Sequence, residues 1–329
     1  MHFVHNLNQN SNMKITFLDA YTSNHGDLEW KDLESLGEVK IYDRTIKSEI
    51  ISRTIDAEVI ITNKVVFDRE LISQLPQLKY ICVAATGYNN VDLEAAREHG
   101  VTVSNVVGYS TSAVAQHVFS LILSLVSKSW AYGQEFHDKV WANCEDFSYF
   151  HDPILELKGK MLGIYGFGKI GQAVARIALA FDMKIQAVHK HPERDKMEGV
   201  EFVDWDSLIK SSDILSLHAP LTNENKGLMN QKVFEEMKNT AILINTSRGP
   251  VINESDLASA LQKRQIKGAG MDVLSMEPPS AENPLIGVPN CLVTPHHAWA
   301  SQEARTRLLA GIVDNIKAYS AGKPINQVS

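Results

Sequence analysis

The stretch MLGIYGFGKIGQAVARIA, Met161–Ala178, decides the fold. An apolar run leads into a glycine-rich turn, and a helical pattern follows. Gly166 permits a tight turn, Gly168 lets the backbone approach a ligand, and Gly171 lets the helix pack closely on the strand. The spacing therefore predicts a strand, a turn and a helix in direct succession.

The helix would begin at Lys169 and Ile170, with its first N–H groups unpaired. Such a terminus carries partial positive charge and suits a pyrophosphate. A glycine-rich packing turn is the alternative interpretation. The flanking strand and helix, and the next strand pattern at the correct distance, favour a dinucleotide site.

Short apolar runs rich in β-branched residues recur on both sides of this stretch, with helical patterns between them. Continuous apolar strands that alternate with helices predict parallel sheets covered on both faces. We expect an α/β protein with two doubly wound parallel-sheet domains. The first series is KITFLD, VKIYD, EVIITN, YICVAA and VTVSN, and the second is MLGIYG, KIQAVH, EFVD, DILSLHA, AILINTS, GAGMDV and CLVTPH.

Three helical or irregular segments complete the predicted organisation. TSAVAQHVFSLILSLVSKSWAYG predicts a long helix after the first series. The aromatic-rich segment 130–152 is either an arm that packs on a partner subunit or a loop over its own domain. A last helix begins after Ser301, with Glu303 in its first turn. Gly322 and Pro324 end it, and its apolar stripe is Leu308, Leu309, Ile312, Ile316 and Tyr319.

If the last helix covers the first sheet, the first domain is discontinuous. We then expect a substrate domain of residues 13–107 and 299–329, a dinucleotide-binding domain of residues 108–298, and two crossings that act as a hinge. Residues 1–12 are expected to be a loose leader, because they are polar and lack a signal-peptide core.

Charge and cysteine usage narrow the class of protein. The 329 residues carry a formal net charge of −7, which gives no electrostatic footprint for nucleic acid or anionic membrane. No apolar run is long enough for a transmembrane helix. Cys82, Cys144 and Cys291 lie far apart in or near apolar runs, which is typical of reduced thiols in a cytoplasmic protein.

Three polar residues follow strands of the second series, where ligands bind in open parallel sheets. Arg248 offers a permanent cation for a substrate carboxylate and carbonyl. His296, with Glu277 as its carboxylate partner, offers a proton donor for an alkoxide. Each residue alone could be a salt bridge, a cap or a satisfied histidine. The set in one dinucleotide domain predicts catalysis of hydride transfer.

Two further features of the same region concern cofactor and metal. Asp272 also follows a strand and could accept from a nicotinamide amide. His296 and His297 are adjacent and should point apart, and no third ligand has suitable spacing. We therefore predict no metal site.

At this point the chain resembles the D-isomer-specific 2-hydroxyacid dehydrogenases over nearly its whole length. The motifs are GFGKIGQAVARIA, LHAPLTNENKGLM, LINTSRGPVINESDLASAL, GAGMDVLSMEPP and LVTPHHAWAS. The resemblance implies a Rossmann-type cofactor domain inserted into a flavodoxin-like substrate domain. It also implies a homodimer and Arg248, Glu277 and His296 as the catalytic set.

The same resemblance implies where the ligands lie. It places Thr246 and Asp272 at the nicotinamide end of the cofactor. In the loop AATGYNNVD, the N–H groups of Thr86 and Gly87 would bind the substrate carboxylate; a simple strand-to-helix turn is the alternative. The adenosine side would be lined by His218, Ala219 and Pro220.

Within the family, the chain is most similar to the glycerate dehydrogenases or hydroxypyruvate reductases. LDAYTSNHGDLEW, YDRT, GYSTSAVAQHVFSLIL and LSMEPPSAENPL carry that likeness. It implies reduction of hydroxypyruvate or glyoxylate to D-glycerate or glycolate. The alternatives are another 2-oxo acid, or a dinucleotide-sensing protein like the corepressors of this superfamily, which the complete catalytic set argues against.

KIQAVHKHPER, Lys184–Arg194, departs from the NAD pattern. About 20 residues after the glycine turn, an NAD protein places an acid on the ribose hydroxyls. Here that position is His189, followed by Lys190 and, further on, Arg194. The two cations could meet a 2′-phosphate and His189 could add a hydrogen bond. We expect preference for NADPH or use of both NADP and NAD; a solvated loop with NAD still bound is the alternative.

Overall fold

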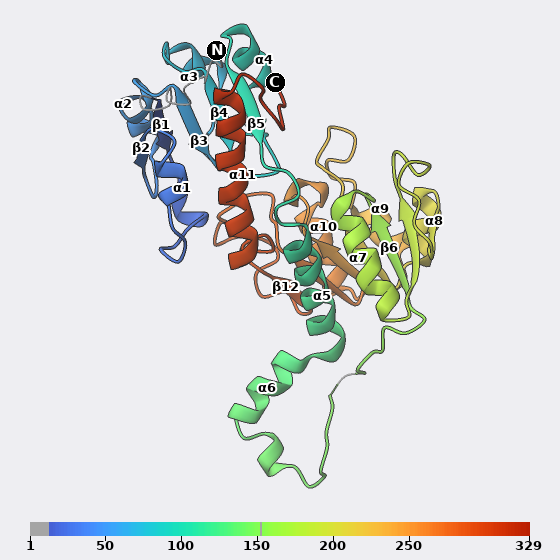
Figure 1. The fold of residues 1–329 in the computed structure, drawn as a ribbon. Coiled ribbons are helices and arrows are strands. Elements are labelled where there is room, and N and C mark those ends of the chain that lie inside the picture. The colour runs from blue at the N-terminus through green and yellow to red at the C-terminus, as the bar shows by residue number, and fades with distance from the viewer. Residues whose placement is uncertain (1–12, 152) are drawn as a thin grey trace, which may run out of the picture. The chain divides into compact units, whose positions relative to one another are not determined.

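The computed structural model describes residues 13–151 and 153–329, so the expected leader lies outside the described residues. The chain forms two compact units (Figure 1). One is Met1–Ser110 with Ala300–Ser329, and the other is Thr111–Trp299. The first unit is therefore discontinuous, and each unit has its own sheet.

The first unit has a five-stranded sheet in the order β2-β1-β3-β4-β5, and every ladder is parallel. Its central strands are buried throughout, as their continuous apolar sequences require. The strands are β1 Lys14–Phe17, β2 Glu38–Ile41, β3 Val59–Thr62, β4 Tyr80–Val83 and β5 Thr102–Asn105. The helices are α1 Lys31–Glu34, α2 Ile50–Thr54, α3 Arg69–Ser73, α4 Leu93–Glu98 and α11 Gln302–Ser320, with 3₁₀ turns at Ala20–Thr22 and Lys47–Glu49.

The last helix, α11, packs on this sheet. The hydroxyl of Ser301 accepts the N–H of Ala304 at 3.2 Å and caps the helix. Tyr319 stacks on Tyr80 of β4 with ring centroids 4.3 Å apart. Gly322 ends the helix in the left-handed region, with φ of 71°. The cap, the stripe and the stop are all confirmed.

The second unit has a seven-stranded parallel sheet in the order β12-β11-β10-β9-β6-β7-β8. The order reverses between β6 and β9, which is the point where doubly wound sheets bind ligands. The strands are β6 Met161–Tyr165, β7 Lys184–Val188, β8 Val200–Phe202, β9 Ile214–Leu217, β10 Ile242–Asn245, β11 Gly268–Met271 and β12 Cys291–Val293. The helices are α5 Thr111–Ser127, α6 Ser129–His137, α7 Lys169–Ala180, α8 Trp205–Ser211, α9 Gln231–Glu236 and α10 Glu254–Gln262, with 3₁₀ turns at Trp141–Asn143 and Gly249–Val251.

Both faces of the seven-stranded sheet are covered, because alternate strand residues point to opposite faces. Ile242 and Ile244 of β10 belong to the core under α5 and α7, whereas Leu243 belongs to the core under α8, α9 and α10. Besides α11, five helices of the two units start after a polar residue whose side chain accepts a backbone N–H. These residues are Asp68, Asp92, Asp204, Asn230 and Asn253.

The long helix expected from Thr111 is wrong in one respect, because it breaks at Lys128. That residue is left-handed with φ of 51°, and α6 starts directly after it. Val126 is the last buried side chain of α5, and serines flank the break. Serine is a weak helix former, and no packing surface continues beyond that point to hold a straight helix.

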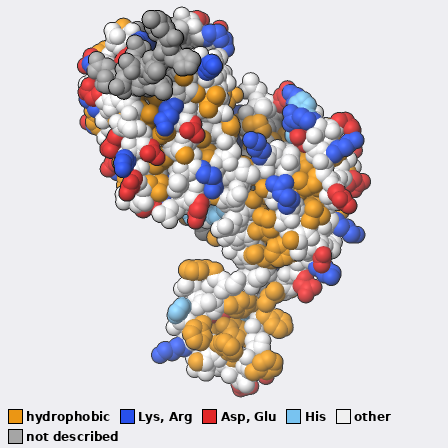
Figure 2. All heavy atoms as spheres, in the orientation of Figure 1, with side chains coloured by type: hydrophobic (Ala, Val, Ile, Leu, Met, Phe, Trp, Pro, Cys, Tyr) orange, Lys and Arg blue, Asp and Glu red, His pale blue; other side chains and the backbone are white. Residues whose placement is uncertain are grey.

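Segment 129–151 forms an arm rather than a cover for its own unit (Figure 1). It folds on itself, since Trp141 Nε1 donates to the carbonyl of Phe147 and the Tyr149 hydroxyl donates to Glu135. Hydrophobic side chains gather on its surface (Figure 2). Trp130, Phe147 and Phe150 are 76%, 92% and 70% exposed. None of the described helices has the length and apolar character to cross a membrane.

The packing of α11 gives a test of stability. Leu308 is fully buried on this helix. Leu308→Ala should lower the free energy of unfolding by about 2–5 kcal/mol, because it removes buried methyl groups and leaves a cavity. Urea denaturation checks this, with the exposed Thr306→Ala two residues away as the control, where we expect less than about 1 kcal/mol. Equal losses in the two variants would contradict the packing described here.

Candidate functional site

The glycine turn has the geometry that its spacing predicts. Gly166 has φ of 94°, and a Cβ atom there would lie 2.5 Å from the amide nitrogen of Ala219. A Cβ at Gly171 would collide with the carbonyl oxygen of Gly166. A Cβ at Gly168 would meet no atom within 4 Å. The first and third glycines are thus required by packing, and the second leaves open space in front of the α7 terminus.

That open space fits the pyrophosphate of a dinucleotide. The helix α7 begins at Lys169, and its first N–H groups, including that of Ile170, have no acceptor within the helix. The terminus offers donors and partial positive charge to an anion. These residues could hold the phosphates of a bound cofactor.

The loop after β9 lies against the glycine turn through the backbone of Ala219. His218, just before it, makes a 2.8 Å hydrogen bond between Nε2 and the hydroxyl of Ser216. Burial lowers the pKa of His218 to about 4, so its ring is neutral near pH 7. Pro220 is exposed. The adenosine side predicted from the sequence is therefore a neutral surface.

His189 follows β7 directly, and both of its ring nitrogens are engaged. The N–H of Phe167, in the glycine turn, donates to Nδ1 at 3.2 Å. Nε2 lies 2.7 Å from Oδ2 of Asp195. A ring that accepts at Nδ1 carries its proton at Nε2 and donates it to the carboxylate. The expected hydrogen bond from His189 to a 2′-phosphate thus has no free ring nitrogen to form it.

Asp195 is the residue that sequence reasoning missed at this end of the site. Arg194 binds it through Nε and Nη2 at distances of 2.6–3.1 Å. The Arg194 guanidinium and then His189 hold the pKa of Asp195 at about 2, so the carboxylate is charged. Lys190 is exposed. The expected cations are present, but an acid lies among them; the signal was an Asp six residues after His189.

At the predicted nicotinamide end, one polar atom is buried and unpaired. The hydroxyl of Thr246, directly after β10, has no hydrogen-bond partner among the described residues. A buried hydroxyl without a partner is costly unless a ligand satisfies it. This orphan group fits a polar ligand such as the carboxamide of a nicotinamide.

Asp272, directly after β11, holds the loop that carries His296. Its carboxylate is 1% exposed and accepts the hydroxyl of Thr294 at 2.6 Å. It also accepts the N–H groups of His297 at 3.0 Å and Ala298 at 2.9 Å. The sequence predicted that the Asp272 carboxylate accepts from a nicotinamide amide. Its three observed donors belong instead to the loop that carries His296.

His117 joins this network from α5, and sequence reasoning did not single it out. Its Nε2 lies 3.0 Å from the Thr294 hydroxyl and 3.5 Å from Asp272. Burial lowers the pKa of His117, which keeps the ring neutral. Its partners Asp272 and Thr294 lie about 155 and 177 positions away along the chain, so no local sequence pattern predicts these contacts.

His297 lies near two potential metal ligands that its sequence neighbours do not indicate. His296 and His297 do diverge, but the fold brings other ligands to His297. Ligand atoms of His117, Asp272 and His297 lie within 4.8 Å of one another. The carboxylate already accepts three donors and the His117 ring already contacts Thr294, so we describe this group as a hydrogen-bond network.

The side chains of His296 and Glu277 are hydrogen-bonded to each other. Nδ1 of His296 lies 2.6 Å from Oε2 of Glu277, and the other carboxylate oxygen accepts the N–H of Leu274 at 2.9 Å. Both side chains are partly open to solvent, at 26% and 33% exposure. His296 has φ of 50°, a left-handed conformation that is unfavourable for a residue with a side chain. The loop contacts of Asp272 therefore hold a strained backbone that aims the ring at Glu277.

Arg248 lies at the neighbouring strand end, after β10. Its backbone carbonyl accepts the side-chain amide of Asn245 at 3.0 Å, and its Nη1 donates to the carbonyl of Ser247 at 2.7 Å. The next residue, Gly249, packs so closely on the backbone of Leu274 that no Cβ would fit. The segments that carry Arg248 and Glu277 are thus in direct contact.

The predicted carboxylate loop belongs to the first unit, after β4. The hydroxyl of Thr86 donates to the carbonyl of Val106 at 3.1 Å, and the side-chain amide of Asn105 donates to the carbonyl of Thr86 at 2.6 Å. Gly87 follows in the same exposed turn. The hydroxyl and the carbonyl of Thr86 thus both hold the loop in place.

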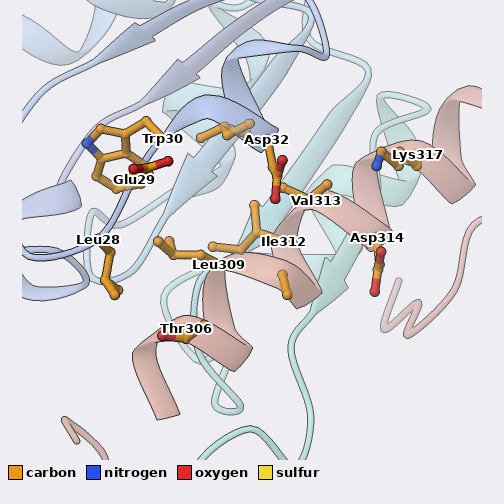
Figure 3. Close-up of a pocket in the computed structure, with 12 residues that line it drawn as sticks. Leu28, Glu29, Trp30, Asp32, Thr306, Leu309, Ile312, Val313, Asp314 and Lys317 are labelled. Carbon is orange, nitrogen blue, oxygen red and sulfur yellow. The ribbon is translucent and has the colours of Figure 1, made fainter. Parts of the chain in front are cut away.

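A cavity of about 340 Å³ lies elsewhere in the first unit, between the α1 region and α11 (Figure 3). Leu28, Trp30, Leu309 and Ile312 form its apolar lining, with Asp32 at its edge. None of the predicted site residues lines it. The cavity therefore adds nothing to the chemistry described above.

The buried neutral histidine predicts a dependence of stability on pH. In the unfolded chain His218 takes a proton below about pH 6.5, whereas the folded protein resists it until about pH 4. The free energy of unfolding should therefore fall as the pH drops from 6.5 towards 4. His218→Gln should fall less steeply in urea titrations across this range. His137→Gln, at an exposed position of α6, is the control. Parallel curves for wild type and His218→Gln would contradict the assignment.

Comparison with known proteins agrees with this geometry. The D-isomer specific 2-hydroxyacid dehydrogenase NAD binding domain matches residues 119–298. A hydroxypyruvate reductase of Blautia hydrogenotrophica is 41% identical over 96% of this chain and 100% of its own length. A glycerate dehydrogenase of Methylorubrum extorquens is 38% identical over 96% and 98%.

Solved structures show the same likeness. An acyclic imino acid reductase in complex with NADPH and D-Arg superposes with a TM-score of 0.85 at 33% identity, covering 96% of this chain and all of that one. The D-lactate dehydrogenase of Escherichia coli gives a TM-score of 0.83 at 30% identity, with the same coverage. The parallel sheets, the glycine turn and the hydrogen-bonded pair of His296 and Glu277 thus occur in a chain that belongs to the D-isomer-specific 2-hydroxyacid dehydrogenase family.

Proposed function

We propose that this enzyme reduces hydroxypyruvate to D-glycerate, or glyoxylate to glycolate, with a nicotinamide cofactor. The 2.6 Å pair of His296 and Glu277 carries the proposal, because it joins a proton donor to a dinucleotide fold. Full-length likeness to a hydroxypyruvate reductase and a glycerate dehydrogenase supports the substrate class. Pocket contacts decide between small 2-oxo acids, so other members of that class are the alternative substrates.

Reduction of a ketone needs a hydride at carbon and a proton at oxygen. When bound, the reduced nicotinamide supplies the hydride to C2 of the oxo acid. His296, held at Nδ1 by Glu277, presents Nε2 as the atom that gives its proton to the nascent alkoxide. The carboxylate stabilises the imidazolium before transfer and keeps the ring in one orientation. The product is the 2-hydroxy acid, and the ring is left neutral.

Arg248 is proposed to bind the substrate carboxylate and to polarise the carbonyl that is reduced. Its guanidinium is permanently charged and presents a planar fork that suits a carboxylate. Its Nη1 is held by the Ser247 carbonyl, which limits the positions the fork can take. The N–H groups of Thr86 and Gly87 are proposed as a second anchor for the same carboxylate.

For the cofactor, we propose preference for NADPH or use of both NADPH and NADH. The absence of an acid at His189 and the cations Lys190 and Arg194 support it. The NADPH complex of the imino acid reductase shows that a fold of this kind accepts the phosphorylated cofactor. The orphan Thr246 hydroxyl supports a nicotinamide amide at the other end.

We further propose a homodimer in which the arm 129–151 packs on a second copy. Large apolar side chains that are 70–92% exposed are unfavourable in water, and a contiguous group of them is typical of an interface. The three cysteines are free thiols, which supports a reducing, cytoplasmic setting.

Steady-state kinetics test the activity directly. We expect turnover of hydroxypyruvate with NADPH or NADH, followed at 340 nm. His296→Ala should lower kcat by at least about 10³-fold, because the proton donor is lost, while cofactor affinity stays close to that of the wild type. His297→Ala removes the same ring one position along and should cost less than about tenfold. Wild-type turnover in His296→Ala, or none in the wild type across a panel of 2-oxo acids, would refute the proposal.

Sedimentation equilibrium tests the arm. Wild type should be a dimer, and the double variant Phe147→Asp, Phe150→Asp should be largely monomeric, because two charges would be buried without partners. Ile286→Asp is the matched control, since Ile286 is 62% exposed but lies outside the arm. A dimer that persists in the double variant, or dissociation in Ile286→Asp, would contradict the assignment.

A further inference from the structure

The contact between His189 and Asp195 changes how the ribose end of the cofactor site is understood. His189 occupies the position where an NAD protein has its acid. Its side chain is 11% exposed and that of Asp195 is 16% exposed, so the pair is largely shielded from water. The ring is a rigid spacer between the Phe167 amide of the glycine turn and the carboxylate.

The hydrogen bonds of His189 also show which ring nitrogen accepts and which one donates. Because Nδ1 accepts the Phe167 N–H, the ring cannot take a second proton without losing that bond to the glycine turn. His189 therefore donates to Asp195 through Nε2, and neither of its ring nitrogens is free for a phosphate. The charged groups here are Asp195, Arg194 and Lys190, so one acid offsets one of the two cations.

Arg194 and Asp195 differ in how firmly they are held. The Arg194 side chain is 67% exposed, and its ion pair with Asp195 faces water, where such pairs contribute little. It can leave Asp195 for a stronger partner such as a phosphate. Asp195 is held from the other side by the buried His189 Nε2 and would remain.

We propose that Asp195 is the residue that sets the discrimination between NADPH and NADH. Asp195 replaces the missing acid, because it lies on the far side of the His189 ring that occupies the usual position. Its negative charge opposes the 2′-phosphate that Arg194 and Lys190 attract. The two effects offset each other, so the enzyme uses both cofactors with little discrimination. This inference rests on the cofactor part of the proposed function and narrows it to dual use.

Cofactor binding tests the inference without any substrate. Dissociation constants for NADPH and NADH are measured by quenching of protein fluorescence for wild type and variants. Asp195→Asn keeps an acceptor for His189 but removes the charge. We expect the ratio Kd(NADH)/Kd(NADPH) to rise about tenfold, the size expected for one charge at close range. The rise should shrink at high salt. Arg194→Gln should lower the ratio.

Glu193→Gln is the matched control. It removes the same charge two positions away from a side chain that is 83% exposed and pairs with Lys196. The ratio should stay within about twofold of wild type. Asp195→Ser is a second neutral variant, and thermal unfolding of every variant confirms that it folds.

Three outcomes would overturn the inference. An unchanged ratio in both Asp195 variants means that Arg194 and Lys190 act alone. A lower ratio means that Asp195 positions Arg194 for the phosphate. An equal rise in Glu193→Gln means that only the overall charge matters. Failure of the proposed reaction is distinct, since wild type would then bind both cofactors but turn over no 2-oxo acid.

Discussion

The buried carboxylate of Asp272 is the constraint on which the conformation of the loop around His296 depends. It sits at the end of β11 with 1% exposure, and its three donors all belong to segment 294–298. That segment forces His296 into a left-handed conformation. Strain of this kind persists only where the surroundings over-determine it. Without the carboxylate, two backbone N–H groups would lose their acceptor and the ring would no longer be held towards Glu277.

The same arrangement explains why several histidines of this unit differ in role. His218 and His117 are partly buried, and burial lowers their pKa, so they serve as neutral hydrogen-bonding groups. His296 is partly exposed, and its Nδ1 lies 2.6 Å from a carboxylate oxygen of Glu277. Histidines of the same unit thus differ in how far they are buried and in which group they contact.

Sequence patterns predicted most of the fold and part of the site, for identifiable reasons. The inner strands follow from continuous apolar runs such as VIIT and YICV, because buried parallel strands need no alternation. The edge strands β2 and β8 are only partly buried, and their short patterns include charged residues. The pairing of His296 with Glu277 followed from their places at strand ends. The break at Lys128 could not be predicted, because the helical pattern continues through it and only the loss of packing beyond Val126 ends the helix. His117 was missed because its partners are distant in the chain.

Asp195 shows a different limit of sequence reasoning. A motif assigns a role to a position, but a binding site needs a charge at a place in space. Here the position holds an imidazole, and the imidazole carries the carboxylate of another residue on its far nitrogen. Because Asp195 N–H also bonds to the carbonyl of His191, the turn between them is fixed and the acid returns to the end of β7. The charge that looks absent at residue 189 is thus supplied six residues later. A prediction of cofactor preference from residues 189, 190 and 194 counts two cations and overlooks the acid that follows Arg194.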